Sequence, residues 1–295
     1  MIPELIEPTA VVCHDAGAAN IIQAWILAKP KHDWRPVMDG PAARSWDSLR
    51  MIIPTFRSLE SALSGASLVL TGTGWSSDLE HLARRLARTR GIPTVAVLDH
   101  WINYEDRFTR NGEVVLPDAI YVTDKYALRE ACLRFPSVPV SLYENLYLAA
   151  QLSELPPLEA NADEVLYLLE PIRADWPRHL PGELEALEYF FKNWDKLNIP
   201  AGATLRLRPH PSDPPGKYAE WLDCYSVSHR HVVLDHSRSL VQDMKRARWI
   251  VGCETYAMVV ALAAGREVIS SLPPWAPPCR LPHEGIIHMS RLNLN

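Results

Sequence analysis

The sequence of 295 residues has few of the features that mark secreted, membrane or metal-binding proteins. Its five cysteines form no Cys-x-x-Cys motif and are odd in number, which argues against both a disulfide framework and a zinc knuckle. Apolar runs such as MVVALAAG end well before the ~20 residues of a membrane-spanning helix. The opening MIPELIEPTAVV carries acidic charge ahead of its apolar run, the wrong order for a secretion signal. We expect a cytoplasmic protein without a transmembrane segment.

Blocks of basic residues are also missing. The net charge is −5 and no Lys/Arg-rich stretch stands out, so affinity for nucleic acid has no evident source. Neither H-E-x-x-H nor D-x-D spacing occurs, and the glycine loops do not read G-x-G-x-x-G. We therefore expect no catalytic metal and no bound cofactor. Small phosphorylated ligands stay compatible with this composition, because a local pocket does not require a basic surface.

The sequence does contain a regular alternation of strand and helix patterns. A β-branched strand at 10–13 leads through a glycine-containing loop into an apolar-periodic helix. A strand at 67–71, a Gly-Thr-Gly loop and a helix that closes at Gly91 repeat the pattern, and a strand at 94–98 follows. Such alternation predicts a parallel sheet whose polar loops gather at the carboxyl ends of its strands.

The alternation stops once and then restarts. Residues 151–162 are rich in Pro and Glu and predict a linker between an N-terminal domain, 1–150, and a C-terminal domain, 163–272. The proline-rich residues 273–295 predict an irregular tail. We expect an α/β protein with two Rossmann-like domains facing a cleft, the second smaller than the first, and ligands collect in such a cleft beyond the strand ends.

Two loops of the first half are candidates for ligand contact. CHDAGAAN brings His14 and Asp15 off a strand end, and Gly17 permits close approach of a ligand. Asp15 suits a general base, although an Asp at this point also serves as a helix N-cap. TGTGWSSD combines Gly72, Thr73 and Gly74 in a loop that binds anions or hydroxyl-rich ligands, or simply makes a tight turn.

A third loop, LDHWINYEDRF, crowds polar and aromatic side chains directly after an apolar strand. A purely structural loop seldom needs so many different functions, so we predict substrate contact here. The residues concerned are Asp99, His100, Trp101, Tyr104 and Arg107.

The second half carries the nonapeptide LRLRPHPSD, residues 205–213. Its period of two predicts a half-buried strand that places Arg208 on its polar face. Pro209 and Pro211 restrict His210, and a fixed imidazole beside an arginine suits an anion. The alternative is a buried turn in which His210 caps a backbone group.

Two further strand ends in the second half offer polar groups. Glu170 ends the strand EVLYLLEP. Gly252, Glu254 and Thr255 start an apolar helix, where free amides and the helix dipole suit a phosphate and Glu254 suits ribose hydroxyls. The alternative for Glu254 and Thr255 is an ordinary N-cap pair.

Together, the two α/β halves, the His-Pro turn and G-x-E-T-x-A-x-x-x-A-L-x-x-G-x-x-V-x-S at 252–270 resemble the GT-B glycosyltransferases. The nearest likeness is to bacterial sialyltransferase-like and capsule enzymes with an HP motif. That resemblance implies that His210, with Pro211, contacts the phosphate of a CMP-activated nonulosonic acid and that Thr255 completes the nucleotide site. It also implies inverting, metal-independent transfer to a glycan or protein acceptor, with association at a membrane or with glycan-assembly machinery.

One departure concerns the base. The family usually carries an acidic D/E-D/E-G motif in its first domain, and the nearest match here is His14-Asp15-Ala16-Gly17. Asp15 is our first choice for the base, with Asp99 or His100 as the second. Trp101 and Tyr104 would then hold the sugar or acceptor by stacking.

Two alternatives remain open on the sequence. A UDP-sugar 2-epimerase or another enzyme of nucleotide sugars also uses two Rossmann-like halves. A nonenzymatic two-lobed binding protein of a glycan-assembly pathway would explain the incomplete acidic motif.

Overall fold

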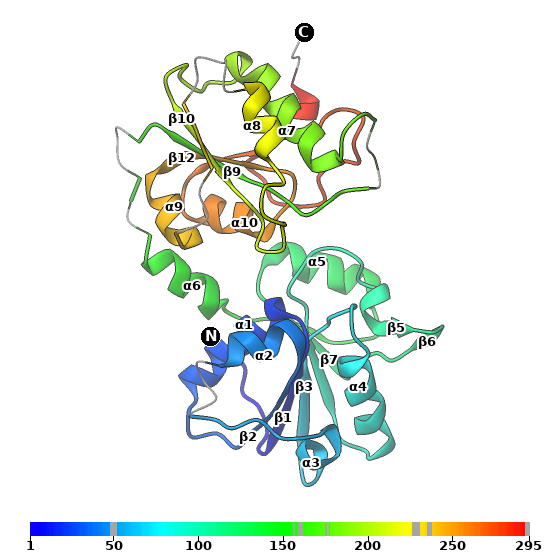
Figure 1. Cartoon of the computed structure of the whole chain (residues 1–295). Helices are drawn as coiled ribbons and strands as arrows, with labels where there is room; N and C mark the ends of the chain where they lie inside the picture. Colours follow the sequence, from blue (N-terminus) through cyan, green and yellow to red (C-terminus); the bar gives the residue numbers. More distant parts are fainter. Residues whose placement is uncertain are drawn as a thin grey trace. The chain divides into compact units, whose positions relative to one another are not determined.

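A computed structural model describes residues 1–47, 52–155, 157–158, 162–174, 176, 178–225, 231–234 and 238–292. The chain divides into two compact units, Met1–Ala149 and Ala150–Asn295, which Figure 1 shows in blue to green and in green to red. The second unit is almost as long as the first, because it includes the segments that the sequence analysis sets apart as linker and tail. Helix α6 (Leu146–Ser153) crosses the boundary and occupies the start of the segment expected to be a linker.

Unit 1 is built on a parallel sheet, which confirms the expectation from the strand and helix alternation. In the described part of the chain its strand order is β2-β1-β3-β4-β7-β8, with every neighbouring pair parallel. The strands are β1 (Thr9–Cys13), β2 (Trp34–Met38), β3 (Leu68–Thr71), β4 (Thr94–Val97), β7 (Ala119–Val122) and β8 (Val140–Leu142). A short antiparallel hairpin, β5 (Thr109–Arg110) with β6 (Glu113–Val114), lies outside this sheet.

Helices cover both faces of the unit 1 sheet. Val11 and Cys13 of β1 pack into one apolar cluster with α1 (Ala16–Ala28), whereas Ala10 and Val12 pack into another with α4 (Leu79–Thr89). Successive side chains of a strand point to opposite faces, so a strand buried on both sides reads as a continuous apolar run. The remaining helices of this unit are α2 (Gly40–Trp46), α3 (Leu59–Leu63) and α5 (Lys125–Arg134), with a 3-10 turn at Asp106–Phe108.

The helix ends of unit 1 follow the predicted signals. Gly91 has φ +65° directly after α4, and the neighbouring Ile92 amide donates to the Ala87 carbonyl, which is the glycine C-cap expected there. Asp124 accepts hydrogen bonds from the amides of Tyr126 and Ala127 at the start of α5, which is a side-chain N-cap.

The strand order of unit 1 reverses between β1 and β3. The helix after β1 lies on one face of the sheet and the helix after β3 lies on the other, so the two connections diverge at the carboxyl ends of these strands. Ligands of doubly wound sheets bind at such a switch point. The fold therefore directs attention to residues 14–17 and 72–77.

Unit 2 is a second parallel sheet with its own switch point. Its order is β11-β10-β9-β12-β13-β14, with all neighbouring pairs parallel in the described residues. The strands are β9 (Glu164–Leu168), β10 (Thr204–Arg208), β11 (Val232–Leu234), β12 (Ala247–Gly252), β13 (Glu267–Ser270) and β14 (Ile286–His288). Numbered along the chain this is the 3-2-1-4-5-6 order of the Rossmann fold, and it reverses between β9 and β12.

Helices flank this sheet on both faces. Figure 1 shows α7 (Gly182–Asn193) and α8 (Ala219–Tyr225) over one face, and α9 (Leu240–Arg246) and α10 (Tyr256–Ala263) over the other. Phe190 of α7 and Trp221 of α8 belong to the same buried cluster as Tyr167 of β9. Short 3-10 turns at Trp194–Lys196 and Met289–Arg291 complete the described elements.

Two expectations for unit 2 are wrong. Strand β10 is not half-buried: it lies inside the sheet, and Arg206 is buried beside Glu164, with Nε and Oε2 3.3 Å apart. The tail after residue 272 is not wholly irregular, because β14 pairs with β13 at the sheet edge.

Candidate functional site

The unit 1 switch point brings His14, Asp15 and Ser76 together. The Nδ1 atom of His14 lies 2.8 Å from Asp15 Oδ1, and the Ser76 hydroxyl donates to the same oxygen at 3.1 Å. Asp15 occupies the N-cap position of α1, yet its side chain makes no capping bond there. The carboxylate therefore binds the imidazole instead of capping the helix, although Asp15 holds the N-cap position.

This geometry fixes which imidazole nitrogen is available. An ionised carboxylate only accepts hydrogen bonds, so His14 carries its hydrogen on Nδ1 and presents Nε2 as a proton acceptor. The side chains of His14 and Asp15 are 18% and 29% exposed, so both are partly open to solvent. An imidazole oriented by a carboxylate is the arrangement of a general base.

Glycines let the polar side chains at this edge approach the backbone closely. A Cβ on Gly40, which has φ +50°, would lie 2.4 Å from His14 Nε2, and a Cβ on Gly74 would lie 2.7 Å from Asp15 Oδ2. At Gly17 a Cβ would lie only 1.9 Å from Asp99 Oδ2. Gly17 was predicted to permit close approach of a ligand. In the structure the Asp99 carboxylate packs against this glycine.

Replacing Gly17 with Ala should lower the free energy of unfolding by about 1–3 kcal/mol, the usual cost of an added group in a tightly packed place. Asp99 cannot swing away without loosening its ion pair with Arg107, whose Nη1 lies 3.0 Å from Oδ1. Urea denaturation measures the change. Gly202→Ala is the matched control, because a Cβ there meets nothing within 4 Å; equal stabilities of the two variants would contradict the prediction.

Glu80, which the sequence analysis does not single out, belongs to the same cluster. It is fully buried, and its Oε1 accepts the His14 amide at 2.7 Å, which fixes the loop that carries the imidazole. Burial raises the pKa of the Glu80 carboxyl. The proximity of Glu80 to a strand-end loop in GTGWSSDLE is the signal that could have singled it out.

Asp99, Thr73 and Arg107 form a supporting network. Besides Asp99, the Arg107 guanidinium donates to the Thr73 carbonyl and hydroxyl, each at 3.2 Å, and to the Ile102 carbonyl at 3.0 Å. Thr73 in turn donates to the Val97 carbonyl at 3.0 Å. These groups hold the ends of β3 and β4 together, which leaves Asp99 less suited to a base than the His14–Asp15 pair.

The aromatic residues of the third loop face into the unit. Trp101 is 9% exposed and donates from Nε1 to Asp124 Oδ2 at 2.8 Å, and Tyr104 is 2% exposed and stacks on Phe135. The nearby His100 accepts the Trp101 amide on Nδ1 at 3.0 Å. Trp101 and Tyr104, predicted to stack on a sugar or acceptor, therefore offer no free ring face.

The unit 2 switch point joins the ends of β9 and β12 through charged groups. Glu170 Oε1 accepts the Glu254 amide at 2.7 Å, and Arg173 bridges the two carboxylates, with Nε 2.8 Å from Glu170 Oε2 and Nη1 2.9 Å from Glu254 Oε1. Arg280, from the segment after β13, also binds Glu254 through its amide and guanidinium. Sequence reasoning missed Arg280.

The arginines change the role expected of Glu254. Burial raises the pKa of its carboxyl, but the hydrogen bonds and charges of Arg280 and Arg173 outweigh burial and lower the pKa below its usual value. Both Glu254 oxygens already accept hydrogen bonds from arginine. The carboxylate that was expected to bind a ribose therefore binds Arg173 and Arg280 in the structure.

The His210 turn is held rigidly, as the two prolines predict. The Asp213 carboxylate accepts the His210 amide at 2.9 Å and the Tyr218 hydroxyl at 2.7 Å. Ser212 contacts His210 Nδ1 with its hydroxyl at 2.7 Å and its amide at 3.2 Å. Since the amide donates, Nδ1 is an acceptor and the neutral imidazole carries its hydrogen on Nε2, ready to donate.

The turn connects to the switch point through Lys217. Its ammonium group lies 2.8 Å from Asp213 Oδ1 and 3.0 Å from Glu183 Oε1, and it donates to the Glu170 carbonyl at 3.2 Å. His210 and Glu170 are thus parts of one hydrogen-bonded network at the carboxyl edge of this sheet.

Other predicted phosphate contacts have structural partners. Arg208 pairs with Asp243 and donates to the Arg238 carbonyl at 2.8 Å. A Cβ on Gly252 would lie 3.2 Å from the Leu168 carbonyl, so this glycine permits strand packing. Thr255 stands at the N-cap position of α10, as one alternative expected, but its side chain makes no cap bond.

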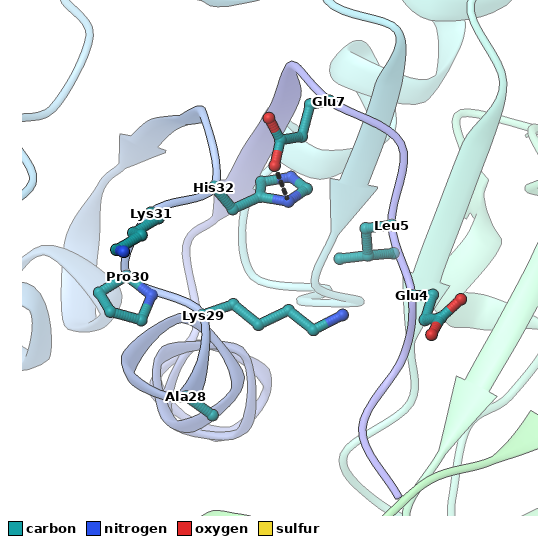
Figure 2. Close-up of a pocket in the computed structure, with 8 residues that line it drawn as sticks. All are labelled: Glu4, Leu5, Glu7, Ala28, Lys29, Pro30, Lys31 and His32. Carbon is teal, nitrogen blue, oxygen red and sulfur yellow. Dashed lines mark ion pairs between the residues drawn. The ribbon is translucent and has the colours of Figure 1, made fainter.

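A cavity of about 570 Å³ lies at the opposite edge of the unit 1 sheet, ahead of β1 and β2, and Figure 2 shows the side chains that line it. His32 and Glu7 form an ion-pair contact there, with Nδ1 and Oε1 3.1 Å apart. Burial lowers the pKa of His32. This cavity lies at the amino ends of the strands and is separate from the His14 cluster. Its lining residues are Glu4, Leu5, Glu7, Ala28, Lys29, Pro30, Lys31 and His32.

The described residues contain no group of three His, Cys, Asp or Glu side chains arranged to hold a metal ion. Within the same ranges, no helix has the length and apolar character needed to span a membrane.

The two sheets and their switch points define a class of architecture: the chain has two Rossmann-like domains of the GT-B type. Similar solved structures include the UDP-GlcNAc 2-epimerase from Methanocaldococcus jannaschii, with a TM-score of 0.62 and 12% identity over 97% of this chain and 94% of that chain. The UDP-GlcNAc 2-epimerase from Neisseria meningitidis bound to UDP-GlcNAc has a TM-score of 0.59 and 13% identity, covering 89% and 82%.

A glycosyltransferase is also similar: the glycotransferase of kitacinnamycin has a TM-score of 0.52 and 12% identity, covering 90% of this chain and 80% of that chain. Likeness at these identities shows the fold alone. No protein-family model matches the sequence, and no curated protein matches it.

Proposed function

We propose that this protein is an enzyme of nucleotide-activated sugars, with a UDP-sugar as substrate and epimerisation at the sugar as its reaction. The observation that carries the proposal is the His14–Asp15–Ser76 arrangement, a partly exposed imidazole oriented by a carboxylate at a switch point. The fold similarity to UDP-GlcNAc 2-epimerases supports the choice of a UDP-sugar over the CMP-sugar that the sequence resemblance implies.

Unit 2 would bind the nucleotide. His210 donates from Nε2 to a phosphate oxygen, held in place by Ser212 and Asp213. The first amides of α10 add donors, because Thr255 leaves them without a side-chain cap. Hydrogen bonds to a charged oxygen are the strong ones in such a site.

Unit 1 would supply the proton transfer. Inverting a sugar carbon requires its hydrogen to leave from one face and a hydrogen to return on the other. His14 Nε2 takes the proton from the carbon next to the anomeric carbon, the C–H electron pair forms a C=C bond, and UDP leaves with the electron pair of the broken C–O bond. Return of UDP to the anomeric carbon and of a solvent proton to the opposite face of the neighbouring carbon completes the epimer. The positive charge on the imidazole is stabilised by Asp15, 2.8 Å from Nδ1. Ser76 and the buried Glu80 hold Asp15 and the His14 backbone in position.

Glycosyl transfer from a CMP-nonulosonic acid is the second candidate. The His-Pro turn favours it, since its histidine is rigid and free to donate at Nε2. In that reaction His14 Nε2 would instead take the proton of an acceptor hydroxyl on a glycan or protein.

Titration calorimetry with UDP, CMP and UDP-GlcNAc tests the substrate class. We expect UDP and UDP-GlcNAc to bind at least tenfold more tightly than CMP, about 1.4 kcal/mol in binding free energy. Proton NMR of UDP-GlcNAc incubated with the enzyme in D₂O should then show a second epimer with deuterium at the inverted carbon. Tight binding of CMP alone would favour the transferase, and no binding of any of the three would favour a nonenzymatic protein.

A further inference from the structure

Trp75 is an exposed aromatic residue at the unit 1 switch point. It is 56% exposed, whereas Trp101 and Tyr104 of the following loop are buried. Leaving an indole in water forgoes the free energy that burial of its apolar surface provides. Sequence reasoning assigned the aromatic contact to Trp101 and Tyr104 and passed over Trp75.

The backbone around Trp75 is fixed on both sides. Arg110 Nη2 donates to the Gly74 carbonyl at 2.7 Å and to the Ser77 carbonyl at 3.3 Å. Arg107 Nη1 donates to the Thr73 carbonyl at 3.2 Å. The exposed indole therefore stands on an anchored loop, which lowers the entropy lost when a ligand packs against it.

The residues on either side of Trp75 both touch Asp15. The Ser76 hydroxyl donates to Asp15 Oδ1 at 3.1 Å. A Cβ on Gly74 would lie 2.7 Å from Asp15 Oδ2, so the Gly74 backbone closely approaches the same carboxylate. The indole is consequently attached within one residue of the groups that orient His14, the base of the proposed function.

We propose that Trp75 is the stacking platform for the pyranose ring of the substrate, an inference that rests on the proposed function. A pyranose has an apolar face of C–H groups and a rim of hydroxyls. The electron-rich face of an indole attracts the C–H groups, while the hydroxyl rim turns toward polar partners such as Ser76. Stacking on Trp75 would hold the sugar at the loop whose Ser76 hydroxyl donates to Asp15, the carboxylate paired with His14.

The platform predicts a difference between two ligands. In Trp75→Ala, the Kd for UDP-GlcNAc should rise about tenfold while the Kd for UDP changes less than about twofold, because only the first ligand carries a pyranose. Trp75→Phe should restore most of the affinity for UDP-GlcNAc. Leu133→Ala removes another exposed apolar side chain, from α5, and should change neither Kd.

Calorimetric titration of the four proteins distinguishes the outcomes, and thermal melts establish that each is folded. If Trp75→Ala weakens UDP and UDP-GlcNAc equally, the indole holds the nucleotide and the inference is wrong. If the wild type binds both ligands and Trp75→Ala binds both as tightly, the platform alone is overturned. A wild-type protein that binds neither ligand overturns the proposed function, and this inference with it.

Discussion

His14→Gln should lower kcat for the UDP-sugar reaction by about 10²- to 10⁴-fold, the usual contribution of a general base. Glutamine reaches about as far as the imidazole but accepts no proton near pH 7. The Kd for UDP should stay unchanged, since the nucleotide is assigned to unit 2. Initial rates of epimer formation from UDP-GlcNAc and calorimetry with UDP measure the two effects separately.

The control for this substitution is His231→Gln, which removes an exposed histidine from the amino end of β11 and should leave kcat unaltered. Asp15→Asn should give an intermediate loss, because the amide still occupies the place beside Nδ1 but no longer stabilises an imidazolium. A fall in kcat matched by a fall in the melting temperature, or no fall in kcat at all, would refute the assignment of His14 as base.

The alternation of buried strands and helices could be predicted because parallel strands covered on both faces leave unbroken apolar runs. Strand β2 was not predicted, because its sequence contains Pro36 and begins with Trp34 and Arg35 instead of an apolar run. Proline is tolerated because β2 is an edge strand. Strand β14 was not predicted either. It is short, lies at the edge of the unit 2 sheet and belongs to a proline-rich segment.

The strand-end positions of His14, Asp15, His210 and Glu254 could also be predicted, but their partners could not. A period of two places Arg206 opposite Leu205 and Leu207, yet it does not reveal that Glu164 neutralises a buried arginine. The contacts that decide each role come from residues distant in sequence.

The orientation of loop aromatics was not predictable for the same reason. Trp101 turns inward to reach Asp124, a partner 23 residues away. Trp75 is 56% exposed, on a loop whose backbone carbonyls accept hydrogen bonds from Arg107 and Arg110. Composition alone favours the third loop as the source of an aromatic ligand contact, whereas the structure buries Trp101 and Tyr104 and exposes Trp75 of the second loop.

His210→Ala should raise the Kd for UDP by about 10- to 100-fold, because a hydrogen bond to a charged group contributes about 1.5–3 kcal/mol. The effect should be as large for UDP as for UDP-GlcNAc, in contrast to that of Trp75→Ala. Titration calorimetry measures both constants, and His231→Ala is a control on the opposite edge of the same sheet.

Ser212→Ala separates the role of the imidazole from the rigidity of its turn. The Ser212 amide still donates to Nδ1 in this variant and keeps the hydrogen of His210 on Nε2, so the Kd for UDP should rise only a few-fold. If His210→Ala instead unfolds the protein, or leaves the Kd for UDP unchanged, the two prolines and Asp213 rigidify a turn that serves stability. If His210→Ala weakens UDP much more than Ser212→Ala does, the Nε2 hydrogen is the group that recognises the phosphate.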